Sequence, residues 1–83
     1  MDIQLLGVDG CPNCKKIEMY VYDVLVELDA MAAVEKITDA AGIKRISGTN
    51  AVPGLVINGK VKFAGRIPSR AEIKKWISEE VNR

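Results

Sequence analysis

Gly10-Cys11-Pro12-Asn13-Cys14 contains both cysteines of the chain, separated by two residues. A disulfide that closes so short a loop stabilises a fold by only about 2 kcal/mol in the chain-entropy estimate. The spacing is therefore better explained by chemistry than by a structural role. Two thiols this close together favour either reversible disulfide formation or the capture of a metal ion.

Length and composition limit the classes of function. The 83 residues, 48% hydrophobic and 28% charged, predict one globular domain over residues 1–83. A formal net charge of +1 and four scattered aromatic residues indicate no surface for nucleic acid or for an anionic membrane. Histidine is absent, which excludes Ser-His catalysis, Cys-His catalysis and Cys₂His₂ zinc sites.

The N-terminal segment does not resemble a secretory signal. Asp2 stands where a basic segment is needed, and Gly7 and Asp9 interrupt the apolar residues that follow. No apolar run is long enough to cross a bilayer. We therefore expect a cytoplasmic protein without a membrane partner, in which a disulfide that opens and closes is more plausible than a permanent one.

A strand and a helix flank the cysteine pair. The apolar run Ile3–Val8 predicts a short buried strand, and Asp9-Gly10 predicts a turn. Cys11 then stands at the N-cap of a helix, with Pro12 at the first helical position, where its missing N–H costs nothing. The helix is expected to end near Asp29. Its apolar residues recur at three- and four-residue spacing and form one core-facing stripe: Ile17, Tyr20, Val21, Val24, Leu25 and Leu28.

The middle of the chain predicts a second strand and a short helix. The strand covers Ala32–Ile37, although alanine and charged residues weaken the pattern. Either Thr38 or Asp39 is expected to cap the helix, which ends at Gly48.

An Asn-Gly pair at residues 58 and 59 predicts a β-hairpin between the strands Leu55–Ile57 and Lys60–Phe63. In the second strand Val61 and Phe63 alternate with lysines. We therefore expect both apolar side chains on one face and this strand at an edge of the sheet.

A capping box from Ser69 to Glu72 begins the last helix. The complete order is β-α-β-α-β-β-α, which predicts an α/β fold with a four-stranded mixed sheet flanked by three helices. The first βαβ unit is a parallel crossover, and the last two strands pair antiparallel. The core-facing residues of the last helix are expected to be Ile73, Trp76, Ile77 and Val81.

This order, with Cys-Pro-Asn-Cys after the first strand and Val52-Pro53 before the third, resembles the thioredoxin fold. The chain is most similar to the small prokaryotic thioredoxin/glutaredoxin-like proteins known as redox-active disulfide proteins. The resemblance spans the whole chain, and its most specific segments are Gly7–Lys16 and Ala51–Arg66.

The resemblance implies a thiol–disulfide oxidoreductase. It implies that Cys11 is the nucleophile and that Cys14 resolves the mixed disulfide. It also implies that Pro53 follows a cis peptide bond and faces the cysteine pair, and that Val52 offers main-chain hydrogen bonds to a substrate. The substrate contacts expected from the resemblance are Pro12, Asn13, Val52 and Pro53.

The same resemblance implies the partners. We expect a disulfide-containing protein or a small thiol as the substrate, and a reductase or a thiol that resets the pair. No cofactor is expected beyond the redox-active disulfide itself. The chain is expected to act as a monomer.

Some positions depart from both parent families. Gly10 replaces the tryptophan that precedes the motif in thioredoxins, and Ile3–Val8 contains no buried carboxylate. Asn13 replaces the tyrosine common in glutaredoxin motifs, and Ala64-Gly65-Arg66 replaces the Gly-Gly-Asp that helps glutaredoxins hold glutathione. These departures favour a protein-disulfide reductase over a glutathione-dependent glutaredoxin.

Charged neighbours are expected to tune the thiols. The thiolate is the nucleophile, and the positive end of a helix dipole at Cys11 favours that anion. Lys15 in the first turn should lower the thiol pKa further, whereas Asp9 should raise it. We expect Cys14, one turn on, to be the more buried thiol. Lys36 either extends under the sheet toward the cysteines and tunes them, or is an ordinary surface lysine.

A metal carrier or sensor is the alternative function. Two thiolates without histidine do not complete a tetrahedral zinc site in one chain. A dimer would supply four sulfur ligands. Within one chain, the sequence predicts no metal site.

Overall fold

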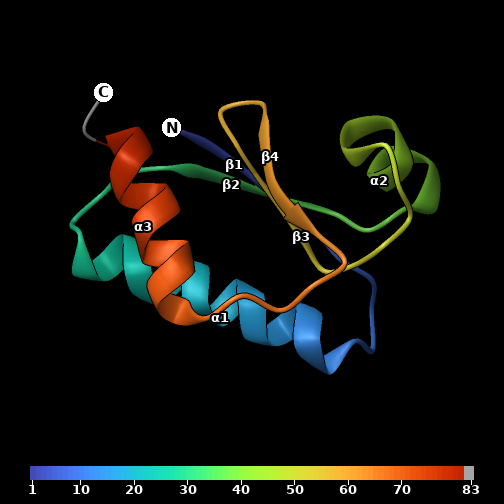
Figure 1. Cartoon of the computed structure of the whole chain (residues 1–83), viewed down its shortest axis with the longest axis horizontal. Helices are drawn as coiled ribbons and strands as arrows, with labels where there is room; N and C mark the ends of the chain where they lie inside the picture. The colour runs from blue at the N-terminus through green and yellow to red at the C-terminus, as the bar shows by residue number, and fades with distance from the viewer. Residues whose placement is uncertain (82–83) are drawn as a thin grey trace.

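The computed structural model describes residues 1–81, which form a sheet and three helices in the predicted order (Figure 1). No helix within this part of the chain is long and apolar enough to cross a membrane. The element boundaries lie close to the predicted ones. The elements are β1 (Asp2–Leu6), α1 (Pro12–Glu27), β2 (Ala33–Ile37), α2 (Ala40–Ser47), β3 (Gly54–Ile57), β4 (Lys60–Ala64) and α3 (Arg70–Val81).

The four strands form one mixed sheet in the order β2-β1-β3-β4. β1 pairs parallel with β2, which confirms the crossover, and antiparallel with β3. β3 and β4 form the predicted antiparallel hairpin, and β4 lies at an edge, as expected from its lysines. β1 therefore has a neighbour on both sides.

Helices cover both faces of the sheet (Figure 1). Alternate side chains of a strand point to opposite faces, so Leu5 and Leu6 contribute to different clusters. The larger cluster lies between the sheet and the helices α1 and α3, and the smaller cluster lies under α2. Because β1 is anchored on both faces, the loop after Leu6 is held at the end of the sheet where α1 begins.

The predicted helix caps are present, and the structure decides between the two candidates for α2. Asp39, not Thr38, is the N-cap, because its carboxylate accepts the N–H of Gly42 at 2.7 Å. At the start of α3, the hydroxyl of Ser69 accepts the N–H of Glu72 at 3.2 Å. The carboxylate of Glu72 accepts the N–H of Ser69 at 3.3 Å in return, which completes the capping box.

The prediction that Val61 and Phe63 share one face is wrong. Leu55 pairs with Phe63, and the next residue, Val56, pairs with Val61, so Lys62 is an extra residue in β4. Such a β-bulge reverses the alternation, and the two side chains point to opposite faces. Phe63 is buried and stacks on a tryptophan of α3, whereas Val61 is 44% exposed.

The prediction that Val81 faces the core is also wrong. Val81 is 40% exposed, and Glu80 is buried instead. The carboxylate of Glu80 forms an ion pair with the ammonium of Lys60 at 3.2 Å. Lys60 pairs with Ile57 across the hairpin, and Ile57 belongs to the core cluster that includes residues of α3. The ammonium of Lys60 therefore lies on the side of the sheet that α3 covers. A paired carboxylate can be buried where an unpaired one cannot.

Candidate active site

Cys11 occupies the N-cap of α1, as predicted. Gly10 adopts a left-handed conformation with φ of 79°, and this turn directs the chain from β1 into the helix. The backbone of Cys11 is extended, and Pro12 is the first helical residue. The sulfur of Cys11 accepts the N–H of Cys14 at 3.1 Å, so a sulfur takes the capping role that an oxygen usually has.

A disulfide joins Cys11 and Cys14, whose Cα atoms are 5.3 Å apart. Both cysteines are only partly buried, so Cys14 is not enclosed in the core. The pair stands at the N-terminus of α1, where the N–H of Cys14 already donates to the sulfur of Cys11. This hydrogen bond and the positive end of the helix dipole favour negative charge on the sulfur of Cys11 when the disulfide opens.

The peptide bond between Val52 and Pro53 is cis, which confirms the expectation from the resemblance. Pro53 is buried and lines the same cleft as the two cysteines. Its carbonyl oxygen accepts the N–H of Gly65 at 2.8 Å, which fixes the start of β3 to the loop after β4. Val52 packs toward α2 and does not line the cleft.

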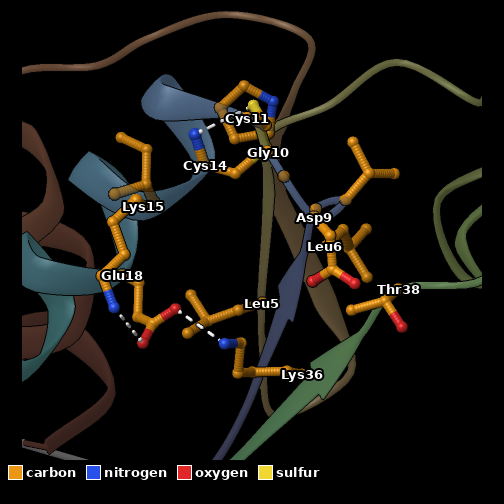
Figure 2. A pocket seen from close by; sticks show the side chains of 15 residues that line it. Leu5, Leu6, Asp9, Gly10, Cys11, Cys14, Lys15, Glu18, Lys36 and Thr38 are labelled. Carbon is orange, nitrogen blue, oxygen red and sulfur yellow. Dashed lines mark hydrogen bonds and ion pairs between the residues drawn. A yellow bond between two sulfur atoms is a disulfide. The ribbon is translucent and has the colours of Figure 1, made fainter.

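A cleft of about 250 Å³ lies between the start of α1, the ends of β1 and β2, and Pro53 (Figure 2). Leu5, Leu6 and Ile17 contribute apolar surface to it. Of the candidate residues from the sequence, Pro12, Asn13 and Val52 are not part of its lining. The candidates that do line it are Asp9, Cys11, Cys14, Lys15, Lys36 and Pro53.

Lys36 reaches the cleft and is nevertheless largely exposed. Its side chain is 55% exposed, and its ammonium forms an ion pair with the carboxylate of Glu18 at 3.1 Å. Figure 2 shows this pair at the opposite end of the view from the cysteines. Lys36 is therefore both a cleft residue and a half-solvated lysine, with its charge balanced by a neighbour.

Glu18 is the residue that the sequence analysis missed. It also pairs with Lys15 at 3.6 Å, and its side chain is only 16% exposed. The hydrogen bond from Lys36 lowers the pKa of Glu18, burial opposes this effect, and the charge of Lys15 lowers the pKa further. The available signal was its spacing: Glu18 follows Cys14 by four residues, which places both on one face of a helix.

The residues that the structure describes offer no ready metal site. Among residues 1–81, no group of three or more Cys, Asp or Glu side chains is arranged to hold a metal ion. The chemistry that the arrangement favours is thiol–disulfide exchange at the N-terminus of a helix.

A family model and two proteins of known name match the sequence of this chain. A family model described as a thioredoxin domain matches residues 1–78. A thioredoxin of Methanothermobacter thermautotrophicus is 40% identical over 78 residues, which cover 94% of this chain and 99% of that protein. A thioredoxin of Methanocaldococcus jannaschii is 33% identical over 73 residues, which cover 88% of this chain and 81% of that protein.

A solved structure is also similar. The crystal structure of a glutaredoxin from Archaeoglobus fulgidus matches with a TM-score of 0.58 and 20% identity. The match covers 90% of this chain and 84% of that chain. At this identity the likeness shows a shared fold.

Proposed function

The chain belongs to the thioredoxin domain family and is a thiol–disulfide oxidoreductase, and we propose that it reduces protein disulfides with Cys11 as nucleophile and Cys14 as resolving thiol. The observation that carries the assignment of Cys11 is its place at the N-cap. Its sulfur already accepts an N–H at 3.1 Å, and the same hydrogen bond would stabilise a thiolate there. The cleft and Pro53 lie beside it.

The reaction proceeds in two exchanges. The thiolate of Cys11 attacks one sulfur of the substrate disulfide, and the other substrate sulfur leaves as a thiolate that takes a proton from water. The thiolate of Cys14 then attacks the sulfur of Cys11, which releases the second substrate sulfur. The substrate gains two electrons and the cysteine pair loses two. A reductase or a dithiol returns the pair to the reduced state.

Two observations favour a protein substrate over glutathione. Arg66, which stands where glutaredoxins have an aspartate, pairs with Glu72 at 3.0 Å and does not line the cleft. In addition, the relatives named thioredoxin are 40% and 33% identical to this chain, whereas the glutaredoxin structure is 20% identical.

Reduction of insulin with a dithiol as electron source tests this proposal. We expect the chain to accelerate insulin reduction and Cys11→Ser to abolish that acceleration, because the nucleophile is gone. A parallel assay with glutathione as reductant and a small glutathione mixed disulfide as substrate should give little turnover. Full activity of Cys11→Ser would overturn the role of Cys11. Faster turnover in the glutathione assay would make the chain a glutaredoxin.

A further inference from the structure

Gly7 is in close contact with Cys14. Gly7 is the first residue after β1, and a Cβ placed on it would lie 2.9 Å from the Cβ of Cys14 and 3.0 Å from its sulfur. Apart from the neighbours of Gly7 in the chain, no other atom would be within 4 Å. A β-carbon at position 7 would therefore collide with Cys14.

The backbone of Gly7 does not itself require glycine. Its φ lies outside the left-handed region, unlike that of Gly10. Its N–H donates to the carbonyl oxygen of Ile37 at 3.1 Å, which extends the pairing between β1 and β2 by one residue. Gly7 is therefore held by the sheet, and the absence of a side chain serves only to leave space.

Cys14 cannot easily move away from position 7. It lies in the first turn of α1, its N–H donates to the sulfur of Cys11, and its own sulfur is held in the disulfide. A β-carbon attached to a helical backbone is not the far end of a flexible side chain. Relief of a collision would shift the first turn of α1, and with it the approach of the two sulfurs.

We propose that Gly7 is a positioning residue for Cys14, because the space that it leaves sets how the sulfur of Cys14 meets the sulfur of Cys11. This inference rests on the proposed role of Cys14 as the resolving thiol. In the step concerned, the Cys14 thiolate attacks the sulfur of Cys11 in the mixed disulfide. The bond between the two cysteines forms, the bond from Cys11 to the substrate breaks, and the substrate sulfur leaves with the electron pair and takes a proton from water.

The position of Gly7 predicts that the two exchange steps respond differently. The Cβ of an alanine would meet Cys14 and no atom of Cys11 within 4 Å. Gly7→Ala should therefore slow the attack by Cys14 and leave the attack by Cys11 nearly unchanged. It should also disfavour the disulfide relative to the dithiol, because the disulfide holds the sulfur of Cys14 where the collision occurs.

The experiment uses the reduced chain and dithiobis(nitrobenzoate), an aromatic disulfide that releases one coloured thiol in each exchange. For Gly7→Ala we expect the first release to keep the wild-type rate and the second to slow by about tenfold. In equilibrium with a reference dithiol, the disulfide should be disfavoured by about tenfold, which corresponds to about 30 mV. Gly42→Ala is the matched control. It also crowds a neighbour, with its Cβ 2.8 Å from the Asp39 carboxylate, but it lies in α2, away from the cysteines.

A stability measurement keeps the inference testable if Gly7→Ala folds poorly. The loss of stability caused by Gly7→Ala should largely disappear in a Cys14→Gly background, because the atoms that collide are gone. An equal loss in both backgrounds, or a second release and an equilibrium that both match wild type, would overturn the inference. Failure of the proposed function gives a different result: Cys11→Ser would then release the first coloured thiol as fast as the wild-type chain.

Discussion

Two glutamates of α1 have similar partners and different surroundings. Glu18 pairs with Lys15 and Lys36, and Glu27 pairs with Lys74 and Arg70 of α3. In each case a hydrogen bond from a lysine is the largest cause that lowers the carboxyl pKa. Glu18 nevertheless lines the cleft of the cysteines and is 16% exposed, whereas Glu27 is 40% exposed and joins two helices.

The difference shows that the surroundings of a glutamate paired with two cations, and not the pairing itself, determine what the ion pairs do. At the start of α1 the carboxylate of Glu18 and its two lysine partners line an open cleft (Figure 2). At the end of α1, the carboxylate of Glu27 and its two cations connect α1 to α3. Exposed ion pairs of this kind contribute little to stability. The start of α1 is therefore expected to control reactivity, whereas stability is expected to come from the packing of α1 and α3 on the sheet.

The largest effect is expected where α1 and α3 pack on the sheet. Ile77 of α3 is fully buried in the larger core cluster, away from the cleft. Ile77→Ala should lower the free energy of unfolding by about 2–5 kcal/mol, because it leaves a cavity. Urea unfolding measures the loss. The thiol reactivity of the protein that remains folded should stay at the wild-type value. A large change in that reactivity would contradict the separation of core stability from cleft reactivity.

A smaller effect separates the two glutamates. Glu18→Gln leaves Lys15 and Lys36 without their carboxylate, and the added positive potential should favour the Cys11 thiolate. Alkylation of the reduced chain near pH 7 should become about threefold faster. Glu27→Gln, the matched control, should leave that rate unchanged. Equal rates in the two variants would show that the cleft carboxylate does not influence the thiols.

The smallest effect is the pH dependence that the two glutamates share. Both carboxyl pKa values lie below the ordinary value of 4.5, so the folded state prefers their charged forms. The stability that they contribute is present above that value and is lost as the pH falls through the lowered pKa of the folded state. The wild-type melting temperature should thus fall more between pH 5 and pH 3 than that of the double variant Glu18→Gln/Glu27→Gln. Parallel melting curves would contradict the stated role of these pairs.

Local pattern was enough to predict most of the fold. The spacing of apolar residues defined α1, the Asn-Gly pair defined the hairpin, and the serine and glutamate of the capping box defined the start of α3. These signals depend on neighbours in the chain. The cis bond before Pro53 was expected from the family resemblance and not from the residues alone, because most X–Pro bonds in folded proteins are trans.

The features that the sequence did not predict depend on contacts between distant segments. The bulge at Lys62 depends on how β4 pairs with β3, and the burial of Glu80 depends on Lys60 of the same strand. Glu18 was missed because a charged residue on an amphipathic helix is normally solvent-exposed. Its role became visible only when Lys36, on β2, was placed opposite it.

Cys11 and Cys14 are expected to react unequally, because only Cys11 stands at the N-cap of α1. The most direct test compares two variants that each keep one thiol, Cys14→Ser and Cys11→Ser. Mass spectrometry would follow the mixed disulfide that each variant forms with a protein that contains a disulfide. We expect Cys14→Ser, which keeps Cys11, to form the adduct faster by about tenfold or more. Equal rates, or a faster reaction of Cys11→Ser, would contradict this expectation.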